Sequence, residues 1–243
     1  MIRRVARRAV PKRLLPGRVD EPWHSGIRNS LLTPLNLYFL NELMQRVGRL
    51  GIQGDIVECG VYKGGSAAVL GWSMMRLEGA PRRLWLFDSF AGMPPAGDED
   101  GDFSHTLEGA YVGSEQRTRD LLARVEVPSD RYEIATGLFE DTFPAIETPP
   151  TALLHVDCDF YEPVKLTLEK FYPRLAPGGF VVLNDYGIYK GARQATDEFL
   201  AAAGLDVEPV AIDPTASFFQ KPGDGFAGLP VAGNFPGWPG AVA

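Results

Sequence analysis

The chain has 243 residues, a hydrophobic fraction of 45%, a net charge of −7 and a pI near 5.1. This length and apolar content suit one large domain with a substantial core. The acidic balance argues against a nucleic-acid partner, because binding to phosphates needs a clustered positive surface, and no run approaches the roughly 20 apolar residues of a membrane span.

The chain starts with a basic segment. Residues 1–18 contain seven of the 24 basic residues and no acidic one, so the remainder carries a net charge of −14. An Arg-rich, acid-free start occurs in transit peptides, but this one lacks their Ser content and also lacks the continuous apolar run of a secretory signal. We interpret residues 1–29 as a basic N-terminal arm or lid, either a flexible tail or a docking arm.

From residue 30 the pattern alternates between helical and strand-like segments. The expected helices are 35–50, 64–77, 115–126, 140–146, 164–175 and 191–203, and the expected strands are 55–59, 83–87, 131–136, 152–156, 180–183, 207–211 and 216–221. This alternation predicts a mostly parallel sheet with helices on both faces. The last strand follows the one before it after a short turn, which suits an antiparallel pair.

The predicted fold class is therefore α/β, a Rossmann-like, mostly parallel seven-stranded sheet with an antiparallel last strand. One domain spans residues 30–221, and residues 222–243 form a Gly/Pro-rich tail. The segment 89–113 is a long loop rich in Gly, Pro and Asp, and long loops in compact domains are usually functional or disordered.

Ligands of open parallel sheets bind beyond the carboxyl ends of the strands. The first strand leads into a glycine-rich turn that ends in Gly64, Gly65 and Ser66. Gly60 lets the chain turn sharply, and Gly64 and Gly65 would let the backbone approach a ligand, whose carboxylate would face the N–H groups of the next helix.

Two acidic side chains complete this predicted cofactor site. Glu58 could accept the amino group of a methionine moiety, and Asp88, at the end of the second strand, could accept both hydroxyls of a ribose. The glycine spacing departs from the dinucleotide fingerprint and disfavours NAD. The alternative is a tight turn whose glycines serve packing alone.

A second polar cluster follows the fourth and fifth strands. Asp157, Asn184 and Asp185 would offer oxygen atoms to one point, a donor set that suits Mg²⁺. Asp159 is a candidate general base, and His105, in the long loop, is a second candidate. The alternative is that these acids cap helices and bind loop backbone.

The remaining histidines and cysteines indicate no further site. The three histidines are too few and too scattered for a zinc site, and His155, inside an apolar strand, is interpreted as a core residue. Cys59 and Cys158 cannot build a disulfide framework, and their expected burial at strand ends favours a reducing, cytoplasmic setting.

Several motifs, in order along residues 30–221, resemble the macrocin O-methyltransferase family. They are residues 54–66, 87–94, 137–144, 157–162 and 177–186. The resemblance implies a class I methyltransferase fold and Mg²⁺-dependent methyl transfer from S-adenosylmethionine to a hydroxyl, usually on a sugar of an antibiotic natural product. It also implies a small-molecule acceptor and a homo-oligomer, a dimer or larger.

The resemblance assigns roles to matching residues. It implies metal ligands at Asp157, Asn184 and Asp185, with Asp159 as base. The cofactor contacts are Glu58, Gly60, Tyr62, Gly64, Gly65, Ser66, Asp88, Ser89, Gly137, Phe139 and Asp157. The chain departs from the family pattern at Asn184, where an aspartate is usual, at Cys158, where a glycine is usual, and at Pro163-Val164, where the family has small hydroxylated residues.

Two other functions are compatible with these residues. One is a metal-independent methyltransferase that acts on a different small-molecule nucleophile. The other is a non-catalytic binding protein that retains the fold. Clustered acids in a cleft argue against the latter, because they are costly without a ligand.

Overall fold

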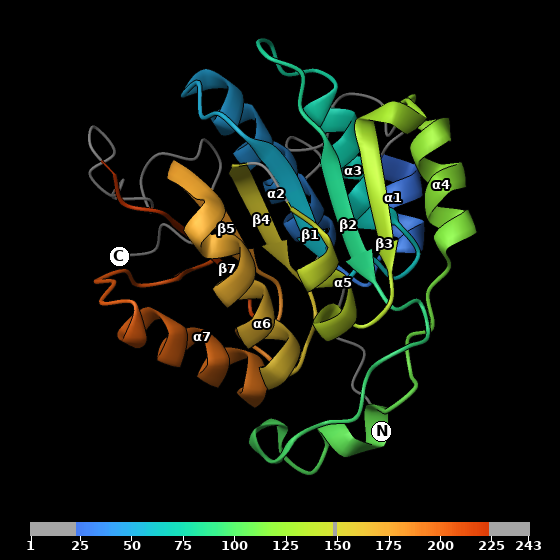
Figure 1. The fold of residues 1–243 in the computed structure, drawn as a ribbon. Coiled ribbons are helices and arrows are strands. Elements are labelled where there is room, and N and C mark those ends of the chain that lie inside the picture. The colour runs from blue at the N-terminus through green and yellow to red at the C-terminus, as the bar shows by residue number, and fades with distance from the viewer. Residues whose placement is uncertain (1–22, 148–149, 224–243) are drawn as a thin grey trace.

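The computed structural model describes residues 23–147 and 150–223. The strands of this part are β1 Asp55–Cys59, β2 Leu84–Asp88, β3 Tyr132–Thr136, β4 Thr151–Val156, β5 Leu175–Leu183, β6 Val210–Ala211 and β7 Ser217–Gln220. They form one sheet in the order β3-β2-β1-β4-β5-β7-β6 (Figure 1). The first five are parallel, and β7 runs antiparallel to both β5 and β6, which confirms the predicted fold class.

Helices cover both faces of this sheet. They are α1 Trp23–Asn29, α2 Pro34–Arg49, α3 Gly65–Met74, α4 Glu115–Arg124, α5 Phe139–Ala145, α6 Tyr161–Phe171 and α7 Lys190–Ala202, with 3₁₀ turns η2 Asp98–Asp100, η3 Ser104–Leu107, η4 Ser129–Arg131 and η5 Tyr172–Arg174. Helices α1 to α4 pack on one face, and α5 to α7 pack on the other (Figure 1). Within this part of the chain, no helix combines the length and the apolar character needed to cross a membrane.

Alternation along the strands supplies both cores. In β1, Ile56 belongs to the core under α1 to α4, whereas Val57 and Cys59 belong to the core under α5 to α7. All five β1 residues are buried, as expected for a central strand of a parallel sheet that is covered on both faces. Because β1 lies between β2 and β4 and is the middle one of the five parallel strands, its end lies near the centre of their carboxyl edge.

Four elements differ from the sequence-based expectation. Strand β5 starts at Leu175, five residues before its predicted start, and β6 covers only the last two residues of the strand predicted at 207–211. Helix α1 was not predicted, and it packs against α3, although the sequence grouped residues 23–29 with the arm. Helix α6 begins at Tyr161, three residues before its predicted start. Pro163 lies in its first turn, where the missing N–H costs no intrahelical bond, so this proline does not mark the helix start. The basic segment 1–18 and most of the predicted tail lie outside the described residues.

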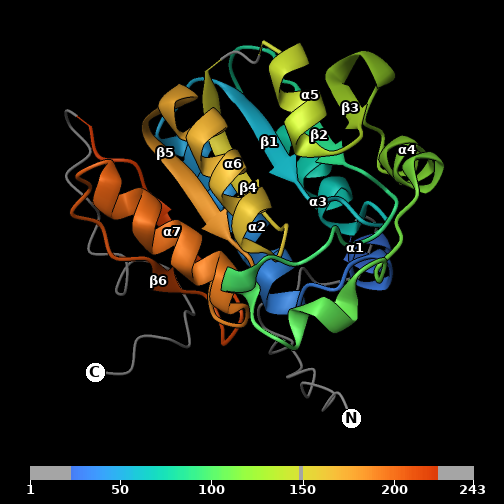
Figure 2. The same ribbon diagram turned by 60° about the horizontal axis from the view of Figure 1, so that its bottom comes forward.

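The long segment 89–113 folds onto the carboxyl edge of the sheet. It contains η2 and η3 and crosses from the end of β2 to the starts of α6 and α7, as the green ribbon in Figure 2 shows. Met93 and Leu107 form a small apolar cluster with Phe160. The segment therefore lies directly over the place where a parallel sheet binds its ligands.

Candidate active site

The turn after β1 brings the ends of two central strands together. Gly60 has φ +92°, and a Cβ added to it would lie 1.7 Å from the carbonyl oxygen of Asp157. The Asp157 N–H donates to the Cys59 carbonyl over 2.8 Å. Gly60 thus permits both the turn and the close approach of β4, so Asp157 begins directly beside the glycine turn.

Asp88 shapes the same turn. Its Oδ2 accepts the N–H groups of Val61 and Tyr62 over 2.6 and 2.7 Å, and its Oδ1 accepts the N–H of Phe90 over 2.6 Å. Tyr62 adopts φ +53°, a conformation that needs support from its surroundings. Oδ1 can accept one further hydrogen bond, for instance from a ribose hydroxyl. The predicted contact with both ribose hydroxyls stays a prediction.

The neighbouring glycines serve packing between helices. A Cβ on Gly64 would lie 2.8 Å from the Cα of Thr118 in α4, and one on Gly65 would lie 2.6 Å from the Gly26 carbonyl in α1. The fold thus requires these two glycines for packing between helices, which was the alternative interpretation, and the predicted close approach of their backbone to a ligand stays a prediction. Gly65 and Ser66 are buried in the first turn of α3.

Glu58 lies beside His155 inside the sheet. The two are register partners on β1 and β4, both side chains are fully buried, and Glu58 Oε1 is 3.0 Å from His155 Nδ1. Glu58 Oε2 and His155 Nε2 have no hydrogen-bond partner among the residues that the structure describes. A buried acceptor without a partner is costly, and Glu58 Oε2 therefore retains the capacity predicted for it, to accept a ligand ammonium group.

Three carboxylates gather where β4 and β5 end. The Asp159 N–H donates to Asp185 Oδ2 over 3.1 Å, and the Asn184 amide donates to Asp157 Oδ1 over 2.7 Å. Asp159 has φ +61°, an uncommon conformation for a residue other than glycine. The structure thus brings Asp157, Asp159, Asn184 and Asp185 together, as the sequence predicted from neighbouring strand ends.

Burial and mutual repulsion perturb these acids. Burial raises the pKa of Asp157, and the neighbouring carboxylates of Asp185 and Glu58 raise it further. Burial also raises the pKa of Asp159, with Asp185 and Asp157 adding to the effect. Burial raises the pKa of Asp185 to about 6, although the N–H of Asp159 opposes that rise. The cluster therefore favours the approach of a positive charge or a proton.

The predicted metal ligands are Asp157, Asn184 and Asp185, and Mg²⁺ prefers such oxygen ligands and usually retains several waters. Within residues 23–147 and 150–223, no three His, Cys, Asp or Glu side chains are arranged to hold a metal ion by themselves. The predicted set combines two carboxylates with an amide. Asn184 Oδ1 accepts from Asn36 over 3.3 Å, and Asn36 has a second acceptor in Thr215. Binding of a cation through the Asn184 oxygen would require the amide to turn, which would break its bond to Asp157 and leave Asn36 with Thr215.

The other predicted cofactor residues lie at the ends of β2 and β3. Ser89 Oγ accepts the Ala91 N–H over 3.2 Å, and the Gly137 N–H donates to the Asp88 carbonyl over 3.1 Å. Phe139 opens α5 and stacks on Phe143 at 4.7 Å. These contacts hold the loops at the β2 and β3 edge, beside Asp88.

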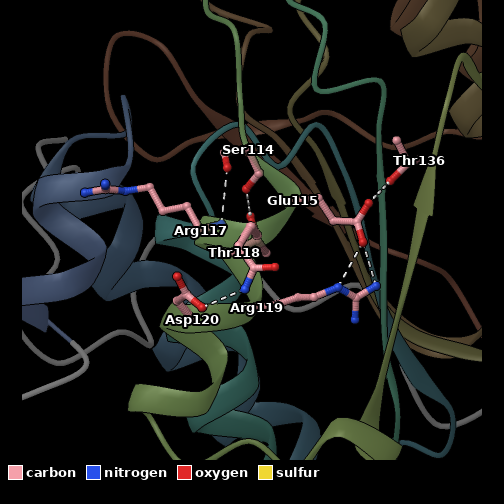
Figure 3. A network of polar contacts seen from close by, with 8 residues as sticks. Ser114, Glu115, Arg117, Thr118, Arg119, Asp120 and Thr136 are labelled. Carbon is pink, nitrogen blue, oxygen red and sulfur yellow. Dashed lines mark hydrogen bonds and ion pairs between the residues drawn. The ribbon is translucent and has the colours of Figure 1, made fainter.

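A polar network fixes the start of α4 against the end of β3. Glu115 accepts from Thr136 over 2.6 Å and from Arg119 over 2.7 Å, and these two bonds, from Thr136 first, lower the pKa of Glu115. In Figure 3, Arg117 points away from this group, toward α1, where its Nε donates to Asn29 over 2.6 Å. Helix α4 is thus hydrogen-bonded both to α1, through Arg117, and to β3, through Glu115.

His105 is the second predicted base. It belongs to η3, and its side chain is exposed. The predicted roles of His105 and of Asp159 as bases both stay predictions.

Sequence reasoning missed three residues near the site. Asn36 lies on the buried face of α2 among leucines, and a polar residue on an apolar helix face was the signal for it. Asp100 accepts the N–H of Tyr161 at the start of α6, and nothing in the acidic run 98–102 distinguishes it. Tyr189 packs edge-on against Phe160 at 6.1 Å.

Comparison with known proteins yields one family. A profile of the macrocin-O-methyltransferase (TylF) family matches residues 26–221. A Streptomyces olivaceus protein, 8-demethyl-8-(2,3-dimethoxy-alpha-L-rhamnosyl)-tetracenomycin-C 4'-O-methyltransferase, is 33% identical over 70% of this chain and 67% of its own. A demethyldecarbamoylnovobiocin O-methyltransferase from Streptomyces niveus is 29% identical over 70% of this chain and 67% of its own.

Solved structures agree with these relatives. The structure of the O-methyltransferase NovP superposes with a TM-score of 0.74 and 26% identity, over 80% of this chain and 83% of that one.

Proposed function

The chain belongs to the macrocin O-methyltransferase family, and from that premise we propose that it transfers a methyl group from S-adenosylmethionine to a sugar hydroxyl of a natural product. The sugar is proposed because the Streptomyces olivaceus relative is named for a rhamnosyl acceptor. The residues proposed to carry out this chemistry lie at the carboxyl edge of the sheet.

We propose that the cofactor lies along the glycine turn that follows β1, beside the end of β2. The free Oε2 of buried Glu58 supports a place for its ammonium group, because an unpartnered buried carboxylate oxygen gains from a positive ligand. The free acceptor site of Asp88 supports a place for the ribose. Gly137 and Phe139, which follow β3, would border the adenine end.

The observation that carries the proposal is the cluster of Asp157, Asp159 and Asp185. Burial raises the pKa of each of them, and repulsion from neighbouring carboxylates raises it further at Asp157 and Asp159. Such perturbed groups in a ligand-binding position are typical of catalytic sites. The alternative reading, acids that only cap helices, does not explain Asp159, because its half-buried side chain lies among other acids and its backbone has φ +61°.

The proposed transfer is an in-line displacement. The acceptor oxygen attacks the methyl carbon, the bond from that carbon to sulfur breaks, and its electron pair stays on sulfur, which leaves S-adenosylhomocysteine. The proton of the acceptor hydroxyl passes to the carboxylate of Asp159, which acts as the general base. Asp185 orients Asp159 by accepting its backbone N–H.

The donor set fits a Mg²⁺ ion held by Asp157, Asn184 and Asp185. When bound, such an ion would lower the pKa of an acceptor hydroxyl on it. A cation there would also offset the repulsion between the acids, so that Asp159 could remain ionised and accept the proton. The metal-independent alternative relies on Asp159 alone.

Calorimetry separates these possibilities. S-adenosylmethionine is titrated into protein treated with EDTA, and Mg²⁺ is then titrated into the complex. Cofactor binding followed by Mg²⁺ binding supports the full proposal, and cofactor binding alone supports the metal-independent enzyme. Absence of cofactor binding would overturn the proposed function.

Compartment and assembly complete the proposal. Cys59 and Cys158 are buried and unpaired, which supports a reducing compartment such as the cytoplasm. Assembly into a dimer or larger homo-oligomer, implied by the family resemblance, is tested by light scattering on the purified chain.

A further inference from the structure

Asp100 is a buried acid that the proposed chemistry does not use. It ends η2 in the loop over the site, with 7% of its surface exposed. Its Oδ1 accepts the Tyr161 N–H over 2.7 Å, and its Oδ2 accepts the Gly97 N–H over 2.9 Å. Both carboxylate oxygens are therefore engaged with backbone, one within the loop and one at the start of α6.

The start of α7 is fitted around the same carboxylate. A Cβ added to Gly191 would lie 1.8 Å from Asp100 Oδ1. No side chain larger than hydrogen can stand there without displacing either the carboxylate or the helix. Asp100 thus joins the loop to the first turns of both α6 and α7, the helices that follow Asp159 and Asp185.

The backbone of Asp159 needs such support. A non-glycine residue at φ +61° is strained and persists only when its surroundings determine it. Two carboxylates accept hydrogen bonds from backbone N–H groups at and just after this strained residue. Asp185 holds the N–H of Asp159 itself, and Asp100 holds the N–H of Tyr161, two residues later.

We propose that Asp100 is a positioning residue for methyl transfer: through the Tyr161 N–H and the fit against Gly191, it fixes the backbone that aims the Asp159 carboxylate at the acceptor. The loop 89–113 is then a fixed wall of the acceptor site, held at Asp100. This inference rests on the proposed function, since it takes Asp159 as the base.

Four variants test the inference. Asp100→Ala removes both bonds, and Asp100→Asn keeps an oxygen for Tyr161 while its amide group opposes the Gly97 N–H. Gly191→Ala should displace the carboxylate and leave Asp100 in the chain. Asp98→Ala, an exposed acid in the same turn, is the matched control.

Turnover is measured with a glycoside probe, demethyldecarbamoylnovobiocin or the rhamnosyl-tetracenomycin acceptor named for the relatives. We expect kcat to fall about 10- to 100-fold in Asp100→Ala and in Gly191→Ala, the range for a misaligned catalytic group. Asp100→Asn should lie between these variants and the wild type. S-adenosylhomocysteine affinity should stay within about twofold, because the Asp100 carboxylate bonds to Gly97 and Tyr161, and neither residue is a proposed cofactor contact.

A double mutant separates positioning from general destabilisation. If Asp100 acts through the base, Asp100→Ala should add little to the loss caused by Asp159→Asn, because residues that act as a unit are non-additive. Multiplied losses would overturn the inference, as would a folded Asp100→Ala protein with wild-type kcat.

Hydrogen exchange gives a readout that needs no turnover. Peptides over residues 159–164 should exchange faster in Asp100→Ala and Gly191→Ala than in Asp98→Ala, and unchanged exchange would overturn the inference. A wild-type protein without turnover on the probes would instead count against the proposed function. If Asp100→Ala does not fold, Gly191→Ala and Asp100→Asn carry the same test.

Discussion

Replacing Asp185 with asparagine should stabilise the ligand-free protein and impair methyl transfer. Burial raises the pKa of Asp185 from 3.8 to about 6, which corresponds to about 3 kcal/mol of unfavourable free energy for the ionised form in the folded state. Asparagine removes the charge and keeps an oxygen that can accept the Asp159 N–H. Because this pKa is raised by folding, the penalty is fully present above pH 6 and fades as the pH falls toward 4.

The assay is urea unfolding in EDTA, without cofactor, from pH 5 to pH 8. Asp185→Asn should raise the unfolding free energy at pH 8 by up to about 3 kcal/mol, and the gain should shrink toward pH 5. The exposed Asp130, changed to asparagine, is the control and should change stability little. A variant that is less stable than the wild type at pH 8, or a gain that does not depend on pH, would refute the reasoning.

The remaining predictions concern the cofactor, the base, the metal and the turn. Asp88→Ala should weaken S-adenosylmethionine binding about 10-fold or more, because loss of the hydrogen bonds to the ribose costs about 1–3 kcal/mol and the glycine turn loses its support. Calorimetry on a folded variant checks this, and unchanged affinity would contradict the proposed position of the ribose. Asp159→Asn should slow single turnover by about 10²–10⁴ with cofactor affinity kept, and a wild-type rate would transfer the role of base to another group such as His105. EDTA should abolish turnover and Mg²⁺ restore it, whereas full activity of metal-free protein would leave the metal-independent mechanism. Gly60→Ala should prevent folding, because a Cβ would lie 1.7 Å from the Asp157 carbonyl; circular dichroism showing a native fold would contradict this.

Much of the fold follows from local pattern. The strand predicted at 55–59 coincides with β1, and the central strands lie where short apolar runs stand between helical segments. The antiparallel last strand follows from the short connection before it. Helix α1 escaped prediction, because its seven residues are too few to show a helical period.

The site could be predicted only to the level of strand ends. Asp157, Asp159 and Asp185 follow adjacent parallel strands, so their meeting follows from topology. Asp100 reaches the same place from a loop 61 residues before Tyr161, and no periodicity determines such a contact. The packing role of Gly65 also depends on a neighbour, since backbone atoms of α1 exclude its Cβ.

We expect the chain to methylate a sugar hydroxyl with S-adenosylmethionine. The most direct test is mass spectrometry of purified protein incubated with S-adenosylmethionine, Mg²⁺ and the two glycoside acceptors named for its relatives, with S-adenosylhomocysteine measured in parallel. We predict one added methyl group on a sugar oxygen, in amount equal to the S-adenosylhomocysteine formed. S-adenosylhomocysteine without a methylated glycoside, or a methyl group found on nitrogen or carbon, would contradict the claim.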